Sequence, residues 1–173
     1  MSQLAALALS IAVLGGVWVF LAFGPLAGAV LVWAGFIAWG AYFHTGGDNA
    51  ALQKTIAGTV YGAIIAGIAL LLVVNNPVGL PAVAAAPVYV AVTVFLLVIV
   101  AGFNLLSVVP NNVYGYAATV AYALQTPTAG GVGPLASLTS VSLANPVLLL
   151  SLSFVIGAVF GMLSGKLAGV LGK

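Results

Sequence analysis

The sequence has no cysteine and no arginine, and its 173 residues include one acidic residue, one histidine and three lysines. Without cysteine there are no disulfides, thiolate metal ligands or thiol redox centres. One histidine and one carboxylate cannot form a catalytic triad, a pair of catalytic carboxylates or a zinc site. We therefore expect no enzyme, metal or cofactor. The net charge of +2 is too small to suggest a nucleic-acid partner.

Charged residues make up 2% of the chain, whereas 64% is hydrophobic and the mean hydropathy is +1.34. Soluble domains carry about 25% charged residues, so the composition indicates an integral membrane protein. Strands of a membrane barrel would alternate polar and apolar residues, but runs such as 63–74 and 88–101 are continuously apolar. An all-α integral membrane protein is expected, as one membrane domain over residues 1–173 without a separate soluble domain.

Glycine, proline and asparagine divide the apolar sequence into expected spans at about residues 4–23, 26–45, 53–74, 88–109, 113–125 and 146–167. The first run exceeds the roughly 7 to 15 residues of a signal-peptide core, so we expect a span there. The fifth is short, reaching about 21 Å of a hydrocarbon core about 30 Å thick. Residues 126–145 form the longest expected loop.

The three lysines indicate the orientation, because cytoplasmic segments collect positive charge. With six crossings and a cytoplasmic N-terminus, Lys54, Lys166 and Lys173 all lie in the cytoplasm. We expect a multi-pass protein of the cell inner membrane with both termini cytoplasmic. If the second and fifth spans were re-entrant, Lys54 would lie outside, which the charge rule disfavours.

The order of the spans repeats: long, then interrupted and aromatic, then rich in small residues. Placing Trp33 over Pro110 pairs Trp39 with Tyr116, and a second register places Gly62 over Gly157. We expect two inverted three-helix repeats, about 1–75 and 88–173, with a connector at 76–87. Inverted repeats with short or interrupted helices in matching positions typically place a transport pathway at the repeat interface.

Small residues recur every fourth position along the third and sixth spans. Such ridges let membrane helices approach closely, so we expect these two spans to be the central packing pair. The alternative for the third span is that small residues are simply frequent in this chain. The helix-packing residues are Gly58, Gly62, Gly157, Gly161, Gly165 and Gly169.

Two segments carry a family resemblance. These are residues 33–43, Trp-Ala-Gly-Phe-Ile-Ala-Trp-Gly-Ala-Tyr-Phe, followed by Gly46-Gly47, and residues 110–115, Pro-Asn-Asn-Val-Tyr-Gly. They resemble the signature segments of small bacterial inner-membrane proteins grouped as domain of unknown function 1097. The resemblance covers nearly the whole chain, although that family usually has Phe where this sequence has Val113. It implies a multi-spanning inner-membrane protein and no established reaction.

Two groups of side chains are candidates to line a pore. The aromatic group could instead face lipid or a neighbouring subunit. The polar group must face protein or water, because unpaired polar atoms in hydrocarbon cost several kcal/mol, and part of it could serve only as interhelical hydrogen bonds. The candidates are Trp33, Phe36, Trp39, Tyr42, Asn111, Asn112, Tyr116 and Thr119.

His44 and Asp48 are four residues apart, so both could lie on one face if the second helix continues that far. They would then form a proton-sensitive or cation-binding cytoplasmic mouth. In the alternative, Gly46-Gly47 ends the helix, Asp48 caps the next one and His44 lies at the headgroups. Two ligands alone make a poor metal site.

The main hypothesis is a channel or facilitator for a small neutral or weakly basic solute, such as urea or ammonia, with its pathway between the repeats. Six short helices enclose little volume, so we expect a homo-oligomer in the lipid bilayer, with a trimer as one option. The alternative is a non-transporting structural or accessory membrane subunit. An enzyme acting on lipid is the weakest hypothesis, because reactive side chains are so few.

Overall fold

The computed structural model describes residues 1–126 and 133–172, and within these ranges its regular structure is helical throughout. This confirms the expected all-α class. Two of the helices, α2 and α5, are shorter than the others. The helices are α1 (Gln3–Phe23), α2 (Val32–His44), α3 (Asn49–Asn75), α4 (Ala82–Ile99), α5 (Val109–Gln125) and α6 (Pro146–Leu171).

Four segments in the described part of the chain are long and apolar enough to cross a membrane. They are α1, α3, the stretch Ala82–Gly102 that contains α4, and α6. These helices fit a membrane protein. With 13 and 17 residues, α2 and α5 extend about 20 and 26 Å at about 1.5 Å per residue, which is less than the hydrocarbon thickness of about 30 Å.

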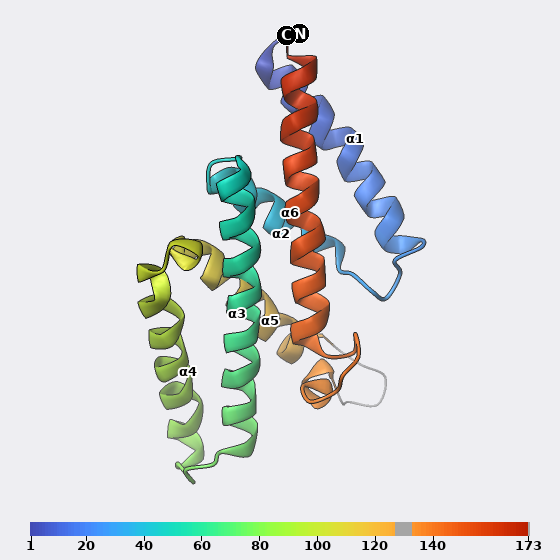
Figure 1. The fold of residues 1–173 in the computed structure, drawn as a ribbon. Helices are drawn as coiled ribbons and strands as arrows, with labels where there is room; N and C mark the ends of the chain where they lie inside the picture. Colours follow the sequence, from blue (N-terminus) through green and yellow to red (C-terminus); the bar gives the residue numbers. More distant parts are fainter. Residues whose placement is uncertain (127–132, 173) are drawn as a thin grey trace.

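The long helices α3 and α6 run in opposite directions at the centre of the molecule (Figure 1). Helix α1 packs along the upper part of α6, and α4 packs along the lower part of α3. The short helices lie behind this layer, where α2 packs mainly on α6 and α5 mainly on α3. Each short helix therefore rests on the long helix of the other half of the chain.

The turn between α2 and α3 is where the sequence predicts it. Gly46 and Gly47 adopt positive φ angles of 126° and 71°, a region that glycine enters without steric cost. The Asp48 carboxylate accepts a hydrogen bond from the Ala51 backbone N–H at 2.6 Å. The predicted cap on the following helix is confirmed, and α3 begins at Asn49, four residues before the expected start of the span.

The predicted start of the second span is wrong, since α2 begins at Val32 rather than near residue 26. Residues 24–29 form turns, Gly28 has a φ of +77°, and Leu31 is extended. The Leu31 backbone N–H donates to Ser153 Oγ on α6 at 2.9 Å. These turns are apolar, and hydropathy cannot distinguish an apolar turn from an apolar helix.

The predicted boundaries around the fourth and fifth spans are also wrong. Helix α4 begins at Ala82 and continues through Pro87, so no break occurs there. The break lies instead at residues 100–108, in two 3-10 turns, η1 (Val100–Gly102) and η2 (Asn104–Leu106). Pro110 stands in the first turn of α5, where its missing N–H would have no helical partner in any case. A proline near a boundary can therefore start a helix as well as end one.

The glycine ridges do not join α3 to α6 in the way the sequence suggests. A Cβ on Gly62 would overlap the Asn112 carbonyl oxygen of α5, and a Cβ on Gly157 would overlap the Gly35 carbonyl oxygen of α2. Helices α3 and α6 do touch, but the predicted packing glycines accommodate the short helices, except Gly169, which is exposed and packs against none of the described residues. The prediction is corrected on this point, because a one-dimensional repeat of small residues does not specify which neighbour fills the groove.

Candidate functional site

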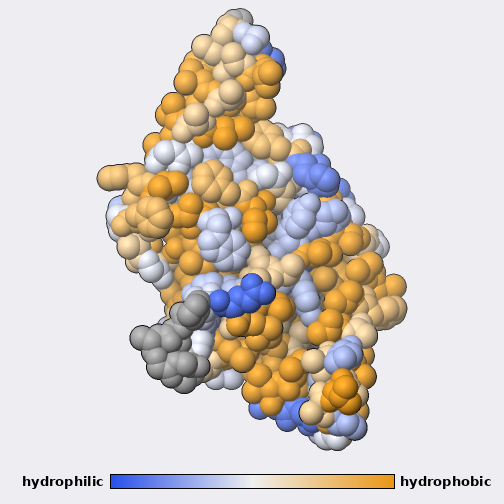
Figure 2. Space-filling model, turned by 180° about the vertical axis from the view of Figure 1, so that it is seen from behind, coloured by the Kyte–Doolittle hydropathy of each residue, from blue (hydrophilic) through white to orange (hydrophobic). Residues whose placement is uncertain are grey.

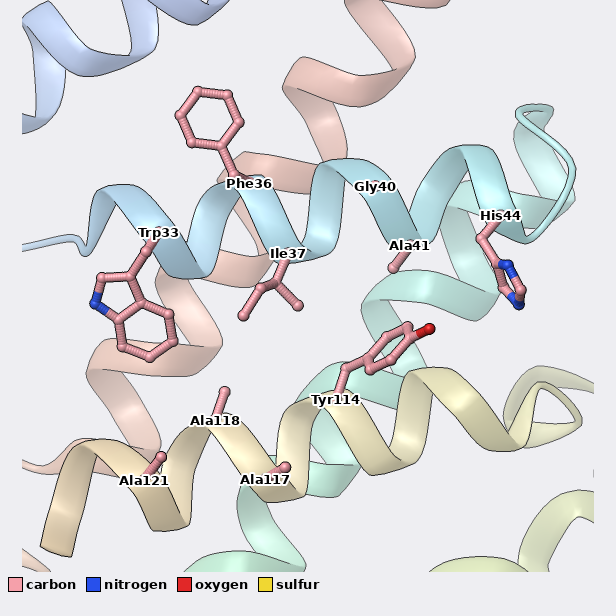
Figure 3. Close-up of a pocket in the computed structure, with 10 residues that line it drawn as sticks. All are labelled: Trp33, Phe36, Ile37, Gly40, Ala41, His44, Tyr114, Ala117, Ala118 and Ala121. Carbon is pink, nitrogen blue, oxygen red and sulfur yellow. The ribbon is translucent and has the colours of Figure 1, made fainter. Parts of the chain in front are cut away.

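A groove of about 540 Å³ separates α2 from α5. The two helices run antiparallel on either side of it (Figure 3). The volume falls within the range of about 300 to 1,000 Å³ found for small-molecule sites. The lining residues are Trp33, Phe36, Ile37, Gly40, Ala41 and His44 from α2, and Tyr114, Ala117, Ala118 and Ala121 from α5.

The groove lining has aromatic rings around a floor of small side chains. Only the Trp33 indole, the Tyr114 hydroxyl and the His44 imidazole bring side-chain polar atoms to it, and it contains no lysine or acidic residue. Trp33 and Phe36 are 41% and 40% exposed. A lining without a fixed charge suits a neutral solute, since an ion would lose its hydration without an opposite charge to replace it.

The face that carries the short helices is the one seen in Figure 2. Less hydrophobic residues gather across the middle of this face, and strongly hydrophobic surface lies above and below them. The groove therefore opens on a face that is hydrophobic at both ends and more polar between.

Of the four aromatic pore candidates, two line this groove and two do not. Trp33 and Phe36 line it, whereas Trp39 and Tyr42 are buried on the side of α2 that faces α6. The Trp39 indole N–H donates to Ser164 Oγ at 2.9 Å. These two side chains thus attach α2 to its partner helix.

The polar candidates of α5 turn away from the groove. Asn111, Asn112 and Thr119 are fully buried, and the first two pack against α3 at Gly58. The Asn111 amide donates to Thr45 Oγ1 at 2.9 Å. The backbones of α3 and α5 touch here, so this interface has no room for a pore.

Asn112 bridges the break between α4 and α5. Its Nδ2 donates to the Leu97 carbonyl oxygen at 3.2 Å and to the Leu106 carbonyl oxygen at 3.1 Å. Both carbonyls lie at the irregular segment, where helical partners are missing. Among the described residues, Asn111 Oδ1, Asn112 Oδ1 and Thr119 Oγ1 are buried atoms without a hydrogen-bond partner.

Tyr116 is separated from the groove as well. Its hydroxyl lies 3.2 Å from Thr93 Oγ1 on α4. The ring lines a second cavity, between α3, α4 and α5. The polar set of α5 is therefore divided between two interfaces, one with α3 and one with α4.

His44 and Asp48 do not form a joint site on one helix face, because α2 ends at His44 and two glycines with positive φ follow. Asp48 caps α3, and both side chains are exposed. His44 lines the end of the groove. Of this pair, only the histidine is placed to meet a solute.

Several groove residues were not among the candidates, chiefly Ile37, Gly40, Ala41 and Tyr114. The sequence does contain a pattern that could have identified them. Lining positions recur on both short helices at the spacing i, i+3, i+4, i+7, which marks one face of a helix. The positions are 37, 40, 41 and 44 on α2 and 114, 117, 118 and 121 on α5, and the two sets differ by the same 77 residues as Trp33 and Pro110.

A protein family matches the chain over residues 8–169, under the description protein of unknown function (DUF1097). The chain belongs to this family. The match spans both short helices and the groove between them. Comparison with curated proteins and comparison with solved structures both found no match. Membership fits the apolar helical fold and assigns no activity, so function must be argued from the groove.

Proposed function

We propose that the protein is a membrane channel or facilitator for a small neutral or weakly basic solute, and that the solute passes along the groove between α2 and α5. The observation that carries the proposal is the cavity of about 540 Å³ lined by matching positions of the two short helices. Its lining contains no lysine or acidic residue, which disfavours ions and fits urea-like or ammonia-like solutes. The proposal involves no catalysis.

Two inverted repeats, α1–α3 and α4–α6, are part of the proposal. The packing supports them: exchanging the halves turns the α3–α5 contact into the α6–α2 contact, and the α1–α6 contact into the α4–α3 contact. Two of the closest backbone approaches are Gly62 to Asn112 and Gly157 to Gly35. These two pairs correspond in the two registers that the sequence repeat predicts.

We further propose six crossings with both termini in the cytoplasm. Helices α1 and α3 run in the same direction (Figure 1), so α2 must carry the chain back between them despite its length. The first and last helices end together, with the Met1 amino group 3.5 Å from the Leu171 carbonyl oxygen. This arrangement supports an even number of crossings, and the lysines favour the cytoplasmic side for the termini.

Trp33 beside the groove and Phe36, whose ring points away from α5 (Figure 3), are both half-exposed, so the face around the groove is open. A solute pathway in a membrane must be separated from lipid, so the proposal includes a homo-oligomer whose subunits cover this face. The same exposed rings support the alternative function, a structural or accessory subunit that uses the face only for contact. A measurement of solute transport distinguishes the channel from the structural subunit.

The test is solute flux into liposomes that contain the purified protein, with urea, ammonia, water and monovalent cations compared. Gly40→Trp places an indole in the groove, where an added Cβ meets nothing within 4 Å. Gly16→Trp on α1 is the matched control, since that exposed glycine also has open space around it. We expect flux of a neutral solute with the wild type and the control, and the rate of empty vesicles with Gly40→Trp.

Equal flux through both variants would place the pathway elsewhere. A wild-type rate no higher than that of empty vesicles, for every solute, would leave the structural-subunit function as the better description.

A further inference from the structure

A second cavity of about 240 Å³ lies between α3, α4 and α5, away from the groove. It differs from the groove in that aliphatic side chains line almost all of it. Its lining residues are Ala69, Leu70, Val73 and Val74 of α3, Ala86 and Val90 of α4, Tyr116, Val120 and Leu124 of α5, and Leu135.

The one polar atom of these side chains is engaged elsewhere. The Thr93 hydroxyl donates to the Tyr89 carbonyl oxygen at 2.8 Å, which leaves Thr93 Oγ1 free to accept from the Tyr116 hydroxyl 3.2 Å away. The cavity therefore offers only hydrocarbon to an occupant, and water would find no hydrogen-bond partner in it.

The corresponding place in the other half of the chain is filled by side chains. In the register of the repeat, Tyr116 corresponds to Trp39 and Val120 to Phe43. The Trp39 ring is buried, is bonded to Ser164 and lies 5.8 Å from the Phe160 ring, centroid to centroid. The Phe43 ring packs over Gly165. Aromatic rings therefore fill the space beside α2, whereas the corresponding space beside α5 is the cavity.

We propose that this cavity binds one acyl chain of a bilayer phospholipid. Val74, Val90 and Leu124 line the cavity and are 58%, 40% and 58% exposed, so it opens on the apolar outer surface, where lipid chains lie. Binding is favoured by dispersion contacts between the acyl chain and the cavity walls, which would otherwise face a void. The site is independent of transport through the groove.

The lining also predicts the headgroup preference. It contains no lysine, histidine or acidic residue. A chain-binding site of this kind holds zwitterionic and anionic phospholipids equally, because a preference for anionic lipid needs basic side chains at the headgroup.

Native mass spectrometry of the purified protein, with equal amounts of phosphatidylethanolamine and phosphatidylglycerol added, tests the proposal. Ala86→Phe directs a ring into the cavity from its α4 wall. Ala91→Phe makes the same change at an exposed position of α4 that does not line the cavity. We expect one retained phospholipid on the wild type and on Ala91→Phe, without headgroup preference, and at least about tenfold weaker retention on Ala86→Phe.

A melting temperature of Ala86→Phe equal to or above that of the wild type would show that a ring fills the space without unfolding the protein. Three results would overturn the proposal: no phospholipid on the wild type, equal retention on both variants, or a strong preference for phosphatidylglycerol.

Discussion

The two short helices each pack on one of the two central helices but are attached to it by different chemistry. Helix α2 is held on α6 largely by aromatic rings, with Trp39 close to Phe160 and Tyr42 packed against Gly161. Helix α5 is held on α3 through buried polar side chains: the Asn111 amide donates to Thr55 Oγ1, and Asn112 packs against Gly58. Both interfaces contain a glycine that brings two backbones into contact. The close approach is thus the common requirement, whereas the surrounding side chains are free to differ.

The largest effects are expected from valine at the contact glycines. Gly62→Val and Gly157→Val each force a side chain into the backbone of a short helix, which should destabilise the fold by about 3 kcal/mol or more. Melting temperature in detergent measures this. Gly169→Val on α6 is the control, because an added Cβ there meets nothing within 4 Å. If only one of the two glycines is sensitive, the halves are not equivalent in packing.

A smaller loss is expected for Asn112→Ala, which has no counterpart in the aromatic half. It leaves the Leu97 and Leu106 carbonyl oxygens without their amide donor, at a cost of about 2 kcal/mol. Thermal unfolding compares it with Asn104→Ala, an exposed asparagine in η2, for which a change below about 0.5 kcal/mol is expected. Equal effects would show that the amide does not stabilise the break.

The caps of the two central helices provide a third comparison. Asn145 caps α6 by accepting from the Val147 N–H, and it also donates to the Leu138 and Ser140 carbonyl oxygens. Asp48 caps α3 through one bond to Ala51. Asp48→Ala should cost about 1 kcal/mol, and Asn145→Ala should cost more, as measured by unfolding in denaturant. A larger loss for Asp48→Ala would contradict this ranking.

The smallest effect is expected for Trp39→Phe. The substitution keeps an aromatic ring between α2 and α6 but removes the indole N–H that donates to Ser164. Hydrogen bonds between membrane helices contribute about 0.6 kcal/mol on average. A double-mutant cycle with Ser164→Ala measures the coupling. A coupling of 2 kcal/mol or more would mean that α2 depends on polar contacts as much as α5 does.

Much of the helical layout follows directly from the sequence. The starts of α1 and α6 and the cap at Asp48 were predicted to within a residue, because Asn145-Pro146 and Gly46-Gly47-Asp48 are local signals with local causes. The break between α4 and α5 was misplaced to Pro110. Its true position depends on Asn112, which reaches back to carbonyls 6 and 15 residues earlier in the chain, and no window of sequence contains that information.

The site was predicted in part. Trp33, Phe36 and His44 line the groove; helical spacing groups the two aromatic residues, whereas the sequence points to His44 only together with Asp48. Asn111 and Asn112 were expected to face a solute because polar residues at membrane depth must avoid lipid. A buried interface satisfies that requirement equally well, and the choice between pore and interface depends on which helix lies opposite.

Sequence alone determined the class of protein, because the class follows from properties summed over many residues. Too little charge is available to cover a water-facing surface. Tertiary structure alone decided that α3 and α6 receive the short helices on their glycines, and that the remaining faces of α2 and α5 enclose the groove. The physical reason is steric. A glycine permits the close approach of any helix, and only the packing of all six helices decides which helix lies against it.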